Sequence, residues 1–77
     1  MKKWLVTWDR KEYKEWAKPT RGGYLLIVLR KEKDRYLCVK AKLKMGAKGL
    51  PGFVVLKEIY FSSRKEAEKQ IYAWMKS

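Results

Sequence analysis

The residues that could do chemistry in this chain of 77 residues are few and poorly placed for catalysis. There is no histidine, so the usual acid–base group near neutral pH is missing, and the single cysteine, Cys38, has no histidine to activate it. Most of the eight acidic residues stand beside basic residues, as on solvated surfaces. We therefore expect no enzymatic activity, no metal, no cofactor and no small-molecule substrate.

The basic residues form a clearer pattern. The stretch 35–57 contains no acidic residue, and its basic residues are Arg35, Lys40, Lys42, Lys44, Lys48 and Lys57. The lysines at 40, 42 and 44 alternate along a run that is typical of a β-strand, so their ammonium groups should project from one face. A glycine-containing loop, 45–52, follows. A surface of one sign beside such a loop favours a phosphate backbone as partner, although edge strands also carry lysine merely to prevent aggregation.

Several neighbouring residues complete the candidate interface. Tyr36 shares the lysine face and could stack on an unpaired base, or it could only cover aliphatic stems. Glycines in the loop would let the backbone approach a phosphate closely, unless the loop is a plain connection. A second basic segment, 10–21, is diluted by two glutamates. The candidate nucleic-acid-binding residues are Arg35, Tyr36, Lys40, Lys42, Lys44, Gly46, Lys48, Gly49, Lys57, Arg10, Lys11 and Arg21.

Composition limits the class of partner. The net charge of +12 predicts a polyanionic partner, either nucleic acid or an anionic membrane surface, and the hydrophobic share of 47% indicates one folded domain. The longest apolar run, Tyr24 to Leu29, is far too short to span a membrane, and no targeting segment is apparent. A lone cysteine agrees with a cytoplasmic protein. We expect nucleic acid, and no membrane, as the partner.

The elements that must position these residues are predicted from periodicity. We expect an α+β fold in which a small antiparallel sheet of about four strands carries a C-terminal helix on one face. A short helix over 10–17, or an irregular loop, should follow the first strand. A capping box at Ser63 and an apolar stripe predict the C-terminal helix. The predicted strands are 4–8, 24–30, 35–45 and 53–61, and the predicted C-terminal helix is 64–75.

The same periodicity predicts which side chains face the core. One set of alternate residues should face inward: Leu37, Val39, Ala41, Leu43 and Met45. Their neighbours, Cys38 among them, should face solvent or a partner with the lysines. A second shared face is predicted for Phe53, Val55, Ile59 and Phe61. Of the four tryptophans, Trp4, Trp8 and Trp74 are expected in the core, and Trp16 is expected to be the most exposed.

Two resemblances bear on function. The run 63–69, Ser-Arg-Lys-Glu-Ala-Glu-Lys, resembles the start of the last helix of double-stranded RNA-binding domains, which end in three strands and a helix. This resemblance implies phosphate contacts by Arg64, Lys65 and Lys69. In size, charge, thermophile-like composition and basic glycine-containing loop, the whole chain resembles the small basic proteins of archaeal ribosomes. That resemblance implies a small α+β domain lying on ribosomal RNA.

Three functional hypotheses follow. The first is a non-enzymatic, cytoplasmic RNA-binding protein, a ribosomal component of a thermophilic archaeon that binds rRNA, with neighbouring ribosomal proteins as further candidate partners. Its lysines would bind phosphates by releasing counterions. The second is a DNA-binding protein, such as a chromatin, single-strand-binding, plasmid or viral regulatory protein. The third is a protein-interaction module that uses an aromatic face.

Overall fold

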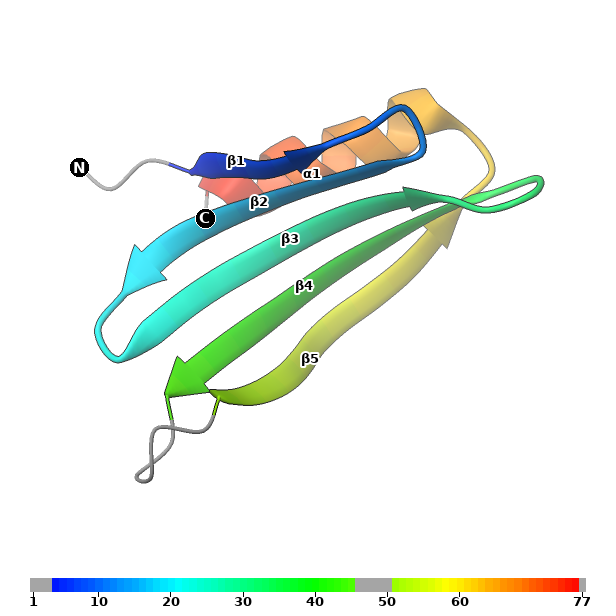
Figure 1. Ribbon diagram of the computed structural model, residues 1–77. Helices are drawn as coiled ribbons and strands as arrows, with labels where there is room; N and C mark the ends of the chain where they lie inside the picture. Colours follow the sequence, from blue (N-terminus) through cyan, green and yellow to red (C-terminus); the bar gives the residue numbers. More distant parts are fainter. Residues whose placement is uncertain (1–3, 46–50, 77) are drawn as a thin grey trace.

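The protein is a single antiparallel sheet with one helix on one face. The computed structural model describes residues 4–45 and 51–76, and Figure 1 shows their arrangement. The strand order across the sheet is β1-β2-β3-β4-β5, so each strand pairs with its neighbour in the chain. The elements are β1 (Leu5–Asp9), β2 (Tyr13–Thr20), β3 (Gly23–Lys31), β4 (Tyr36–Met45), β5 (Pro51–Phe61) and α1 (Arg64–Lys76).

The α+β class and the C-terminal helix are confirmed, but the number of strands is five rather than about four. The predicted helix or loop over 10–17 is wrong, because residues 13–20 form β2. A tight hairpin joins β1 to β2, and in it Arg10 and Tyr13 exchange backbone hydrogen bonds of 2.8 and 3.3 Å. Strand β2 then pairs with β3 along its whole length. Ladder hydrogen bonds on both sides outweigh the weak tendency of a two-turn segment to be helical.

The core lies between α1 and one face of the sheet, which we call the helix face. It consists of Ile27, Leu29, Cys38, Ala67, Ile71 and Trp74. The Cys38 thiol is fully buried and lies 3.6 Å from the carbonyl oxygen of Ala67 on the helix. At the far end of α1, the indole Nε1 of Trp4 donates a 3.1 Å hydrogen bond to the carbonyl of Met75. Trp74 belongs to this core, as predicted.

The predicted orientation of β4 is wrong. Cys38 faces the helix, so the face that carries Tyr36 and the lysines is the face on which α1 packs. The alternate set, Leu37, Val39, Ala41 and Leu43, lies on the opposite face, which no described element covers and which we call the open face. Helix α1 packs on Cys38 and Tyr36, the two residues of the first set that are not lysine, so alternation along β4 alone could not show which side the helix covers.

Two β-bulges account for the misplacement of Trp8 and of side chains on β5. A register shift between Val6 and Trp8 leaves Trp8 half-exposed on the open face, whereas Trp4 packs against the core. A second shift, opposite Lys40 and Ala41, reverses the alternation within β5. Ile59 and Phe61 therefore face the helix, whereas Phe53 and Val55 face outward. Trp16, expected to be exposed, instead packs against the core on the helix face.

On the open face, two adjacent rows of cross-strand neighbours carry no charged side chain. We call these two rows the apolar patch. The first row is Leu5, Ala17, Leu26, Ala41 and Val55, and the second is Pro19, Tyr24, Leu43 and Phe53. No helix among the described residues is long and apolar enough to cross a membrane.

Candidate nucleic-acid interface

The helix covers only part of its face of the sheet. It contacts β3, β4 and β5, and Figure 1 shows the Met45 end of β4 and the Pro51 end of β5 extending past it. The helix-face residues in this uncovered part include five lysines, which we call the lysine surface. They are Lys18 on β2, Lys40, Lys42 and Lys44 on β4, and Lys57 on β5.

The strand register brings these lysines together. Across the sheet, Lys18 is followed in one row by Leu25, Lys42 and Val54, so cationic and apolar side chains alternate. Lys40 lies directly opposite Lys57 in the next row. Along β4 the three lysines recur at intervals of about 6.8 Å, because two strand residues span about that length. The result is a two-dimensional array of cations rather than a single line.

No lysine of this surface forms an ion pair with a carboxylate in the part of the chain that the structure describes. Lys18 lies over an aromatic ring instead, with its Nζ 5.8 Å from the centre of the Trp4 ring. Like charges directly opposite on neighbouring strands are destabilising. An anion placed between Lys40 and Lys57 would remove that repulsion, so the array is electrostatically suited to a polyanion.

Arg21 is the only other predicted residue that lies at this end of the described sheet. It occupies the β2–β3 hairpin with Gly22, whose φ of +87° is the left-handed conformation that glycine adopts freely. The hairpin closes at the pair Thr20–Gly23, and Gly23 is also the partner of Lys44. Arg21 therefore extends the basic end of the sheet toward β2. Gly46, Lys48 and Gly49 lie outside the described residues.

The remaining predicted residues lie at the opposite end. Arg35 forms an ion pair with Glu32 at 3.0 Å, and its guanidinium lies 4.0 Å from the centre of the Tyr60 ring. Tyr36 packs against the core instead of standing beside the lysines as a stacking platform. Arg10 lies over the ring of Trp8 at 5.4 Å. The structure therefore divides the predicted site into two separate regions.

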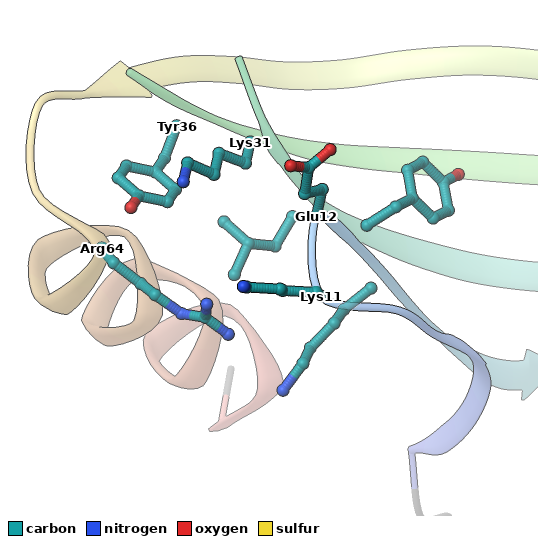
Figure 2. Close-up of a pocket in the computed structure, with 8 residues that line it drawn as sticks. Lys11, Glu12, Lys31, Tyr36 and Arg64 are labelled. Carbon is teal, nitrogen blue, oxygen red and sulfur yellow. The ribbon is translucent and has the colours of Figure 1, made fainter. Parts of the chain in front are cut away.

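That opposite end has a small hollow of its own, shown in Figure 2. Its basic side chains come from the β1–β2 hairpin, β2, β3 and the start of α1: Lys11, Lys14, Lys31 and Arg64. Two of them already have carboxylate partners. Arg64 pairs with Glu68 at 2.9 Å, and Lys14 lies 3.8 Å from Asp9. Glu12 also lines the hollow. The net charge of this hollow is therefore closer to zero than that of the lysine surface.

Sequence reasoning missed Lys18 as a member of the lysine surface. Its place depends on the pairing of β2 with β3, which sets it two strands away from Lys42 in the same row. A signal was present, because Lys14, Trp16 and Lys18 alternate as strand residues do. The helical spacing of Tyr13, Trp16 and Ala17 concealed that signal.

The described residues offer little for covalent chemistry. Burial raises the pKa of the Cys38 thiol to about 11, so it is a neutral thiol at neutral pH and a poor nucleophile. Burial, and next the nearby Glu15 carboxylate, raise the pKa of Tyr13. Within residues 4–45 and 51–76, no group of three or more histidine, cysteine or acidic side chains is placed to hold a metal ion.

Comparison of the chain with protein-family models, with curated proteins and with solved structures gave no significant match.

Proposed function

We propose that this is a non-enzymatic RNA-binding protein of the cytoplasm, and that its lysine surface binds the backbone of ribosomal RNA. The observation that carries the proposal is the register pair Lys40–Lys57 within an array of five lysines that has no carboxylate partner among the described residues. The net charge of +12 supports the same class of ligand.

The mechanism is electrostatic. A phosphate backbone that runs along β4 would meet a cation about every 6.8 Å, and each contact would release condensed counterions. The apolar Leu25, between Lys18 and Lys42, and Val54, beside Lys42, would lie against the sugars. Lysine contacts to phosphate position a protein without reading bases, so sequence preference should be weak.

RNA is proposed over DNA because the chain resembles small basic archaeal ribosomal proteins in size, charge and composition. The same lysines would serve a DNA-binding protein. Affinities for structured RNA, single strands and duplex DNA of equal length separate these two proposals. Strong preference for duplex DNA would replace the RNA proposal with the DNA proposal, and co-sedimentation with ribosomal subunits would support the ribosomal role.

The experiment that tests the interface is a titration of RNA at several salt concentrations. Five phosphate contacts to a single strand predict a slope of about −3.5 for the logarithm of affinity against the logarithm of salt. Replacing Lys40, Lys42 and Lys44 together with glutamate should abolish most of the affinity. A response that is flat between low and physiological salt would contradict the proposal.

A matched control is a triple glutamate variant at Lys33, Lys65 and Lys69, which changes the net charge equally. Lys33 lies in the β3–β4 hairpin, and Lys65 and Lys69 lie on α1, so none of the three is part of the lysine surface. Two of them are the phosphate contacts that the resemblance to double-stranded RNA-binding domains implies. If the control loses as much affinity as the first triple variant, the binding site is not the lysine surface.

A further inference from the structure

The open face of the sheet is apolar and exposed where the lysine surface lies on the other side. Within the apolar patch, the exposed fractions are 56% for Leu5, 58% for Phe53, 47% for Val55 and 45% for Tyr24. Trp8, at 50%, adjoins the patch in the next row of the same face. Contiguous apolar surface of this extent on a small protein marks an interaction site.

The chemistry of the patch excludes a polyanion as its occupant. Neither of its two rows contains a basic side chain that could neutralise a phosphate. The next row of the open face carries two acidic residues, Glu15 and Glu58, which would repel one. The occupant is therefore an apolar protein surface.

We propose that this surface is the open face of a second copy of the chain, so that two sheets pack face to face. Half of the surface of Trp8, Tyr24 and Phe53 together is roughly 300 Å², if each aromatic side chain offers about 150–250 Å² when fully exposed. Leu5, Val55 and the partly buried leucines and valines between them enlarge this area toward the 800 Å² or so that each partner gives to a standard interface.

The fold gives a second reason for this occupant. A stable domain buries an apolar sheet face against another layer, and among the described residues only one of the two faces has its layer. A second copy supplies the missing layer by a two-fold axis, in which the same patch meets itself. At the margin of the patch, Glu15 and Glu58 share the open face with Arg30. Acidic and basic side chains are thus both present to form a polar rim around the interface.

The high positive charge does not oppose this arrangement strongly. The lysine surface lies on the helix face, so in the dimer the two lysine surfaces would be separated by two packed sheets about 10 Å apart. Interactions between exposed charges at such distances are largely screened at physiological salt, where the Debye length is about 8 Å.

Adjacent residues on the two edge strands give matched variants. Leu5 and Val6 on β1 are exposed by 56% and 58% but face opposite sides, and so do Phe53 and Val54 on β5, at 58% and 51%. In sedimentation equilibrium of nucleic-acid-free protein, the wild type should have twice the chain mass of 9.2 kDa. Leu5→Glu and Phe53→Glu should each weaken the dimer at least tenfold, whereas Val6→Glu and Val54→Glu should leave it intact.

A second measurement needs no variant. Because dimerisation stabilises the folded state by mass action, the thermal midpoint of the wild type should rise with protein concentration. A monomer at every concentration, with a constant midpoint, overturns the proposal. So does an equal loss of the dimer in the Leu5 and Val6 variants, since that would place the contact elsewhere. A wild-type monomer that forms a complex only with a different protein would assign the patch to that partner instead.

Discussion

Lys40 of β4 and Lys57 of β5 lie directly opposite each other in the sheet, and neither pairs with a carboxylate among the described residues. Elsewhere in the described chain, Lys14, Arg35 and Arg64 each have an acidic partner. These three cations form ion pairs within the protein, whereas the lysine surface is available to a ligand. It also means that the lysine surface reduces stability in the unbound protein.

Replacing Lys57 with glutamate tests this relationship. The variant should be more stable than the wild type by about 0.5–1 kcal/mol at low salt, because an attractive cross-strand pair replaces a repulsive one. Its RNA affinity should fall, and its salt dependence should lose at least about one unit of slope. Urea unfolding and RNA titration measure the two effects. Lys33→Glu, with the same change in charge, should leave RNA binding nearly unchanged, and a Lys57 variant that is less stable at low salt would contradict the prediction.

The two faces of β5 should respond differently in RNA binding. Val54 lies beside Lys42 on the helix face, and its neighbour Phe53 lies on the open face. Val54→Glu should weaken binding of a short RNA several-fold by adding a negative charge to the lysine surface. Phe53→Glu should leave that affinity within about twofold, as expected for a charge behind a sheet and beyond a Debye length. Equal losses in the two variants would show that RNA does not distinguish the two faces.

Two glycines beside Lys44 should differ in their tolerance of alanine. A Cβ on Gly23 would overlap the carbonyl oxygen of Leu43, whereas a Cβ on Gly52 would meet only the Lys44 carbonyl oxygen at 3.8 Å. Gly23→Ala should therefore separate β3 from β4 and cost about 2 kcal/mol or more, in the range of strained substitutions. Gly52→Ala should change stability by less than about 1 kcal/mol. Equal unfolding midpoints for the two variants would contradict this packing.

The buried Cys38 should make stability depend on pH in the alkaline range. Burial raises the pKa of its thiol from 9.0 to about 11. Between these values the unfolded chain loses the thiol proton while the folded chain keeps it. Stability is thus complete below pH 9 and falls by about 2 kcal/mol as pH rises to 11.

Because lysines also titrate in this range, the comparison is with Cys38→Ala. The stability difference between wild type and variant should shrink by about 2 kcal/mol from pH 8 to pH 11 in urea unfolding. Parallel stability curves for the two proteins would show that the thiol has the same pKa in the folded and unfolded chains.

Local patterns predicted the parts of the fold that local physics determines. The helix that begins at Arg64 was predictable from its apolar stripe, and its observed end is Lys76 rather than Met75. The strands rich in branched residues were predictable from the alternation of their apolar side chains. Residues 13–20 were not, because Tyr13, Trp16 and Ala17 have helical spacing and Pro19 disfavours a central strand. Pro19 is tolerated because the pairing of β1 with β2 ends at Leu5–Ala17 within the described residues.

Only part of the candidate site was predictable, because the rest depends on the register between paired strands. Alternation placed Lys40, Lys42 and Lys44 on one face, which the structure agrees with. It could not show that Lys18 shares the face, because this depends on register across two strand pairs. Nor could it show that Tyr36 lies under the helix, since that depends on which face α1 selects. The bulge opposite Lys40 and Ala41 adds an irregularity that no period-two pattern contains.

The order of strands has a consequence for how the chain folds. Because each strand pairs with its neighbour in the chain, the sheet can grow one hairpin at a time through contacts of short sequence separation, which favours rapid folding. The hydrogen bond from Trp4 to Met75 joins residues 71 positions apart, and we expect it to form after the rate-limiting step. Trp4→Phe should then speed unfolding and leave the folding rate nearly unchanged, which stopped-flow kinetics would measure. The meander would thus set how fast the native state is reached, and the contact between its first strand and its helix would set how long it lasts.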